Sequence, residues 1–120
     1  MKKFLLMSVF AVFVALQAHA AYEHPMDTMM KSWIGHLPKE AVKVWGNPTK
    51  IDYERGQTKY TWTEISSKFV RGTEFKQKTV CNRIFITDTA GRIVFAKFTG
   101  DGCPFTTVGV NEKYPAPSNK

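Results

Sequence analysis

Apolar residues recur at helical spacing close to the start of the chain. In the segment 26–34 they fall at positions i, i+3, i+4, i+7 and i+8, which lie on one face of a helix: Met26, Met29, Met30, Trp33 and Ile34. Gly35 follows at the place of a C-terminal helix cap. The pattern predicts an amphipathic helix that ends near Gly35.

A second, shorter amphipathic segment follows. Pro38 suits the first turn of a helix, and the sequence Gly46-Asn47-Pro48 ends it. Its apolar face consists of Leu37, Ala41, Val44 and Trp45. The Met and Trp stripe of both segments could form a binding surface, but packing in a core is the more common role of residues at helical spacing. We therefore expect Trp33 and Trp45 to be largely buried.

The pattern changes to that of β-strands after Pro48. Residues 49–65 predict two strands joined near Arg55-Gly56, with Tyr60 and Trp62 on one face. Residues 66–77 are mostly polar and carry two isolated phenylalanines, so they predict a long loop or a ragged edge.

Residues 78–100 predict a further hairpin with a three-residue loop at Thr89-Ala90-Gly91, where Gly91 adopts the left-handed conformation. In this register Ile86 faces Val94 and Ile84 faces Ala96, which makes one side of the hairpin apolar. The other side is a mixed surface that consists of Arg83, Phe85, Thr87, Ile93, Phe95 and Lys97.

The two cysteines lie at the base of this hairpin. The predicted register sets Cys81 opposite Thr99, one residue before the turn Gly100-Asp101-Gly102, and the glycines let the chain bring Cys103 back towards Cys81. A cysteine at such a turn could be a nucleophile, a metal ligand or half of a disulfide. The even number of cysteines in an exported chain favours a Cys81–Cys103 disulfide.

The fold class predicted from this order is α+β, with two N-terminal helices packed on a small antiparallel β-sheet. Residues 1–20 have a basic start, an apolar run and the sequence Ala18-His19-Ala20, as in a signal peptide cleaved after Ala20. Residues 21–105 then form a single domain, and the Pro-containing residues 106–120 form a loosely ordered tail. The predicted location is the periplasm or the secreted fraction.

The net charge of the chain indicates which kinds of partner it could bind. The chain has 17 Lys and Arg against 10 Asp and Glu, and removal of Lys2 and Lys3 leaves 15 against 10, a net charge of +5. An excess of positive charge favours anionic partners such as lipid headgroups, lipopolysaccharide or an acidic protein face, although it also serves solubility. Export argues against a nucleic-acid partner.

Candidate catalytic chemistry is sparse, and the sequence predicts a protein that is not an enzyme and binds no cofactor or metal. After cleavage of the signal peptide the chain keeps two histidines, His24 and His36. They are twelve residues apart and have no cysteines near them in the sequence, so they match no known spacing of metal ligands. Asp52, Glu54 and Glu64 could supply paired carboxylates, but polar faces of antiparallel strands commonly carry such residues.

The front of the chain, "SWIGHLPKEAVKVWGNPTK", resembles the SmpA/OmlA-type small envelope domain, as does the order of helices and strands. The matching residues are Gly35, Val42, Trp45, Gly46-Asn47-Pro48, Tyr60 and Trp62. The resemblance covers about residues 26–103 and implies a two-layer α+β fold, related in shape to β-lactamase-inhibitor-protein domains, without catalytic activity. The latter half, "CNRIFITDTAGRIVFAKFTGDGC", resembles small exported bacterial proteins with a cysteine on either side of the last hairpin. The SmpA/OmlA-type family includes the small lipoprotein of the outer-membrane β-barrel assembly machinery, and this chain lacks the cysteine that carries the lipid in that lipoprotein.

Three functions follow as hypotheses. The first is a periplasmic module that binds an envelope protein or complex through an exposed surface of Arg83, Phe85, Phe95 and Lys97; alternatively, Phe85 and Phe95 pair across the strands beneath the 66–78 connection. The second is inhibition of a hydrolase of the lysozyme or β-lactamase type. The third is association with anionic lipid or lipopolysaccharide through Lys68, Arg71, Lys76 and Lys78.

Overall fold

The computed structural model describes residues 23–117, which form helices on an antiparallel sheet. The order of elements is α2 (Pro25–Lys31), α3 (Pro38–Trp45), β1 (Lys50–Glu54), β2 (Gln57–Phe69), β3 (Lys76–Thr87), β4 (Ile93–Thr99) and α4 (Thr107–Lys113). The predicted α+β class is confirmed. The predicted signal peptide lies outside the described residues. Within residues 23–117, no helix is long and apolar enough to cross a membrane.

The sheet has four strands in the order β1-β2-β3-β4, and each neighbouring pair is antiparallel. The first hairpin turns where the sequence predicts, because Arg55 and Gly56 both have positive φ, at 50° and 77°. Two consecutive positive φ values are the mark of the tight turns that fit the twist of a hairpin.

At the start of each N-terminal helix, a side chain accepts a hydrogen bond from a backbone N–H group. The His24 side chain accepts a hydrogen bond from the Met26 N–H at 3.0 Å, and the Glu40 carboxylate accepts one from the Leu37 N–H at 2.7 Å. This backbone hydrogen bond, together with His36, lowers the pKa of Glu40. Helix α2 ends at Lys31, so the chain turns before Ile34, which is exposed although its spacing predicted it on the apolar face.

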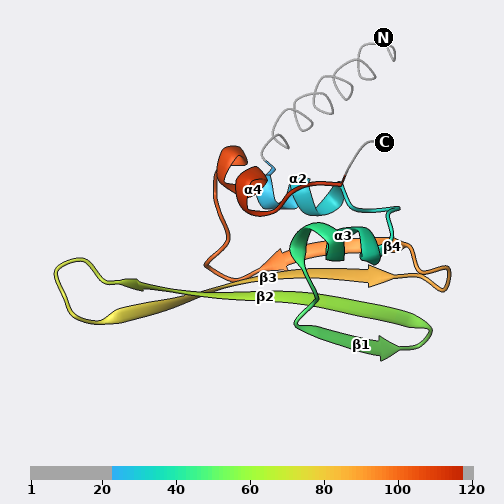
Figure 1. The fold of residues 1–120 in the computed structure, drawn as a ribbon, viewed down its shortest axis with the longest axis horizontal. Coiled ribbons are helices and arrows are strands. Elements are labelled where there is room, and N and C mark those ends of the chain that lie inside the picture. Colours follow the sequence, from blue (N-terminus) through green and yellow to red (C-terminus); the bar gives the residue numbers. More distant parts are fainter. Residues whose placement is uncertain (1–22, 118–120) are drawn as a thin grey trace, which may run out of the picture.

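The three helices of the described chain lie on one face of the sheet (Figure 1). Between the two layers lies a core built largely of methionine and aromatic side chains. Its buried members are Met26, Met29, Met30, Trp33, Ala41, Trp62, Cys81, Phe85, Ile93, Ala96, Cys103, Val110 and Tyr114. Trp33 is fully buried as predicted, whereas Trp45 is partly buried and its indole N–H donates to the Pro115 carbonyl at 3.1 Å.

The register of the last hairpin differs from the predicted one. Ile86 pairs with Phe95, whereas Thr87 pairs with Ile93, so Val94 is an extra residue on β4. Such a β-bulge moves every residue beyond it to the opposite face relative to an unbroken ladder. The predicted pairing of Ile86 with Val94 is therefore wrong by one residue.

As a result, the predicted mixed surface is divided between the two faces of the sheet: Arg83 and Phe85 of β3 face the helices, whereas Phe95 and Lys97 of β4 face away from them. Phe85 is fully buried, and its ring centroid lies 5.3 to 5.9 Å from those of Trp33, Trp45 and Trp62. Packing this ring among the indoles removes a large apolar area from water, which favours the bulged register.

Most of the segment predicted as a long loop or ragged edge belongs to a β-ribbon, because β2 runs to Phe69 and β3 begins at Lys76. Strands β2 and β3 stay paired from Ser66↔Thr79 to Phe69↔Lys76, and residues 70–75 join them. Neither β1 nor β4 pairs with this part of the sheet. The ribbon also extends beyond the helices (Figure 1). We refer to residues 65–80 as the arm.

The C-terminal segment is more ordered than predicted. Residues 107–113 form α4, whose Val110 is buried, and Tyr114 directly after it is 1% exposed. The Thr106 hydroxyl accepts a hydrogen bond from the Gly109 N–H at 3.0 Å and caps this helix. The expectation of a loosely ordered tail is therefore wrong for residues 107–114.

Candidate binding surfaces

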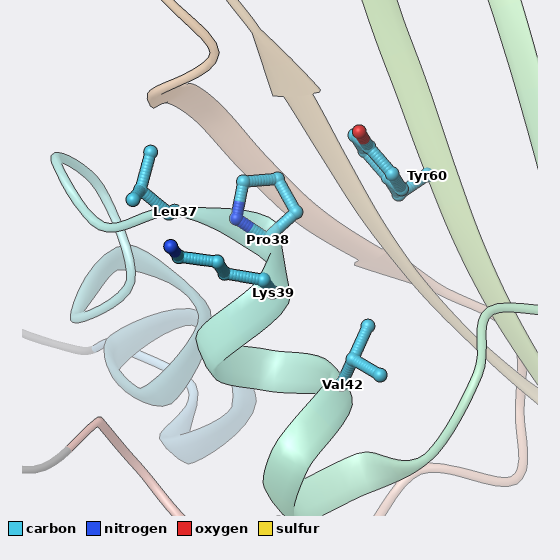
Figure 2. A pocket seen from close by; sticks show the side chains of 5 residues that line it. All are labelled: Leu37, Pro38, Lys39, Val42 and Tyr60. Atoms are coloured by element: carbon cyan, nitrogen blue, oxygen red, sulfur yellow. The ribbon is translucent and has the colours of Figure 1, made fainter.

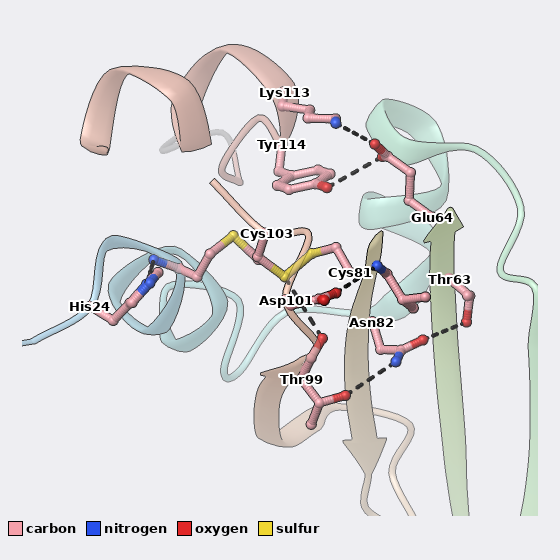
Figure 3. The surroundings of a disulfide bond; sticks show 12 residues. His24, Thr63, Glu64, Cys81, Asn82, Thr99, Asp101, Cys103, Lys113 and Tyr114 are labelled. Atoms are coloured by element: carbon pink, nitrogen blue, oxygen red, sulfur yellow. Dashed lines mark hydrogen bonds and ion pairs between the residues drawn. A yellow bond between two sulfur atoms is a disulfide. The ribbon is translucent and has the colours of Figure 1, made fainter. Parts of the chain in front are cut away.

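The two cysteines are bonded to each other. The Cys81–Cys103 disulfide has an S–S distance of 2.04 Å, and both residues are buried (Figure 3). The strand register sets Asn82, not Cys81, opposite Thr99, but the turn still returns Cys103 to its partner. The predicted disulfide is confirmed, so neither sulfur is a free nucleophile.

The turn Gly100-Asp101-Gly102, which precedes Cys103, packs closely against β3. The Gly102 N–H donates to the Val80 carbonyl at 2.8 Å, and the Val80 N–H donates to the Asp101 carboxylate at 3.0 Å. A Cβ atom placed on Gly100 would lie 2.1 Å from the Val80 oxygen. Glycine is therefore required here for close approach of the two backbones as well as for a φ of 104°.

The four residues predicted as one partner surface do not lie together. Arg83 and Phe85 are buried beneath the helices, whereas Phe95 is 47% exposed and Lys97 is exposed on the opposite face of the sheet. Phe85 pairs with Ala96 rather than Phe95, so the alternative of a Phe85–Phe95 pair is wrong as well. The β-bulge at Val94 causes both errors.

Arg83 lies between two aromatic rings. Its guanidinium carbon is 4.6 Å from the centroid of Trp45 and 4.1 Å from that of Tyr114. The Arg83 Nε has no hydrogen-bond partner in the structure, and burial lowers the pKa of this side chain. The guanidinium thus connects α3 to the segment after α4.

Glu64 anchors the same segment from β2. Its carboxylate forms an ion pair with Lys113 and accepts a hydrogen bond from the Tyr114 hydroxyl at 3.3 Å (Figure 3). Burial, with the nearby Glu64 charge, raises the pKa of Tyr114 to about 12. Tyr114, Arg83 and Glu64 therefore hold the C-terminal segment on the sheet.

The remaining polar candidates do not form one site. Asp52 and Glu54 line a 260 Å³ hollow on the helix-free face, while Glu64 lies on the opposite face. His24 caps α2, and the His36 Nδ1 lies 3.2 Å from the Glu40 carboxylate. Within residues 23–117, no group of three His, Cys, Asp or Glu side chains is arranged to hold a metal ion.

An apolar hollow lies between α3 and the sheet. It has a volume of about 420 Å³ and is lined by Leu37, Pro38, Lys39, Val42 and Tyr60. Figure 2 shows the Tyr60 ring facing Pro38 and Val42 from across the hollow.

The surface continues from the hollow onto β1. Ile51 is paired with Tyr60, and Tyr53 with Thr58, so both side chains point to the same face of the sheet as Tyr60. Ile51 is exposed, and Tyr53 is 80% exposed. We refer to the hollow together with Ile51 and Tyr53 as the shelf. The sequence predicted that Tyr60 and Trp62 share one face of the strands, but the open hollow could not be predicted without the position of α3.

The arm carries the other large group of exposed apolar side chains. Phe69 and Phe75 are 65% and 77% exposed, and Val70 between them is also exposed. The sequence did single out Phe69 and Phe75, because they are isolated in a polar segment.

Comparisons of this chain with models of known protein families, with curated protein sequences and with solved structures found no match. The resemblance to an SmpA/OmlA-type domain therefore stays a prediction, and the candidate surfaces are defined by the fold alone.

Proposed function

We propose that this chain is a non-enzymatic periplasmic module that binds a protein of the cell envelope through the shelf. The observation that carries the proposal is an apolar hollow of about 420 Å³ continuous with two exposed apolar side chains, Ile51 and Tyr53. Exposed apolar surface that is contiguous and partly concave is characteristic of binding sites, whereas single exposed apolar residues are common.

The dimensions of the shelf suit a partner helix. Neighbouring strands lie about 4.8 Å apart, so one helix, roughly 10 Å across, covers two strands of a sheet. The face of β1 and the adjacent part of β2 lies beside α3 and carries Ile51, Tyr53 and Tyr60. A partner helix placed there would fill the hollow and cover these side chains.

Charge indicates the composition of that partner. Lys39 lines the hollow and Lys43 lies one turn further along α3, and neither forms an ion pair with an acidic residue among residues 23–117. A partner with acidic residues beside its apolar face complements these two cations.

The compartment is supported by two features. Disulfides persist in oxidising compartments such as the bacterial periplasm, and Cys81 is bonded to Cys103. The apolar run at the start of the sequence has the composition of a secretory signal.

Site-specific photo-crosslinking in the exported protein tests the proposal. A photoreactive phenylalanine replaces Tyr53 on the shelf, and in a control it replaces Val108, which is also strongly exposed, on α4. We expect crosslinking to one partner from position 53, and no crosslinking to that partner from position 108. The substitution Tyr53→Glu should abolish co-purification of the partner at an unchanged melting temperature. Equal adducts from both positions, or none, would refute the shelf as the binding surface.

A further inference from the structure

The arm has no role in the shelf, and its composition points to a second kind of partner. It is a two-stranded ribbon whose base is held at Val80 by the turn 100–102, and neither β1 nor β4 pairs with it. Isolated two-stranded ribbons are marginally stable in water, so an exposed arm of this kind gains stability from a surface that it contacts.

The turn at the end of the arm presents its apolar side chains to solvent. The Val70 N–H donates to the Phe75 carbonyl at 2.9 Å, and the Thr73 N–H donates to the Val70 carbonyl at 3.0 Å. Gly72 has a φ of 80°, which such a turn requires of one residue. The turn therefore satisfies part of its own backbone while Phe69, Val70 and Phe75 remain exposed around it.

Cations surround this apolar end on both faces of the ribbon. Lys68 is paired with Gln77, whereas Lys76 and Lys78 alternate with Gln77 and so point to the opposite face. Arg71 lies in the turn itself. Glu74 is the single acidic residue of the arm, so four cations against one anion give a net charge of +3.

We propose that the arm inserts end-on into the interface of an anionic lipid membrane. Phe69, Val70 and Phe75 enter the boundary between headgroups and acyl chains, and the surrounding cations contact the anionic headgroups. A flat acidic protein face would contact cations on one side of the ribbon only. A membrane surrounds the inserted end, and cations on both faces match that arrangement.

The same end limits the depth of insertion. Glu74 precedes Phe75 in the chain, and a charged group is costly to bury in hydrocarbon. The insertion is therefore interfacial and reversible. Each cation close to an anionic surface strengthens binding by about fivefold at low salt, and this contribution weakens as salt rises.

Vesicle sedimentation of the exported protein, after its amino terminus is established by intact mass, tests the proposal. The vesicles contain phosphatidylcholine alone or with one quarter phosphatidylglycerol. We expect binding to the anionic vesicles only, and a loss of at least tenfold for Phe69→Ser/Phe75→Ser and for Lys68→Glu/Lys76→Glu. The controls Phe95→Ser and Lys97→Glu change an exposed phenylalanine and lysine outside the arm and should bind as the parent chain does.

A fluorescent residue in the arm separates insertion from charge attraction alone. The three tryptophans lie outside the arm, so Phe75→Trp adds a reporter whose emission should shift to shorter wavelength with anionic vesicles. Binding without this shift, or binding that the serine variant retains, would overturn the insertion. Equal losses in the arm and control variants, or no binding to anionic vesicles, would overturn the assignment of the arm to lipid. The shelf variant Tyr53→Glu should still bind vesicles, so this outcome is independent of the proposed protein partner.

Discussion

Gly100 offers the most direct test of how the turn and the disulfide depend on each other. A Cβ atom at this position would lie 2.1 Å from the Val80 carbonyl oxygen and 2.9 Å from its carbon. Both atoms belong to the backbone of β3, which cannot rotate away as a side chain can. Gly100→Ala should therefore push the turn off β3. Gly91 provides a matched control, because it also has positive φ, at 83°, and has no atom within 4 Å of an added Cβ.

The magnitude follows from the contacts that the turn makes. A left-handed conformation costs an alanine roughly 1–2 kcal/mol, and both variants share this term. Displacing the turn also removes the Gly102–Val80 and Val80–Asp101 hydrogen bonds, each worth about 1 kcal/mol. We expect Gly91→Ala to lower the free energy of unfolding by about 1–2 kcal/mol and Gly100→Ala by about 3–4 kcal/mol.

Urea denaturation with a thiol titration measures both effects. The exported variants are unfolded in urea, and free thiols are counted under the same denaturing conditions. We expect no free thiols in the parent chain or Gly91→Ala, and a fraction of unbonded Cys81 and Cys103 in Gly100→Ala. Closure of a loop with a sequence separation of 22 stabilises a fold by about 3 kcal/mol, so the unbonded fraction should unfold at lower urea. Equal unfolding midpoints for the two alanine variants would refute the reasoning.

Two further predictions concern the buried aromatic residues. Phe85→Ala should lower the free energy of unfolding by about 3–5 kcal/mol, because it leaves a cavity at the centre of the core. Phe95→Ala should lower it by less than about 1 kcal/mol, because Phe95 is half exposed. Similar urea midpoints for the two variants would contradict the bulged register. The raised pKa of Tyr114 favours the protonated phenol in the folded state, so its contribution is complete below about pH 10 and is lost as pH rises towards 12. The free energy of unfolding should fall by roughly 3 kcal/mol over this pH range. Tyr114→Phe should not show this fall, and an identical loss of stability at alkaline pH in both chains would contradict the prediction.

The sequence alone determined the features that depend on neighbouring residues. The spacing of Met26, Met29 and Met30 predicted the buried face of α2, and Arg55-Gly56 predicted the first hairpin turn. Local periodicity and turn preference suffice there, because the physical causes lie within a few residues of one another. The disulfide was also predictable, since the cysteines sit at the base of one hairpin and a shift of one residue leaves them within reach.

Only the tertiary structure decided which face of β3 packs beneath the helices. Val94 gives no local signal of a bulge, and the choice depends on whether Phe85 or Ile84 packs among the indoles of Trp33 and Trp45. The burial of Tyr114 likewise depends on Arg83 and Glu64, which lie 31 and 50 residues earlier in the chain. The shelf and the arm arise where the helices stop covering the sheet. Their extent is set by the packing of elements far apart in the sequence, which no local pattern encodes.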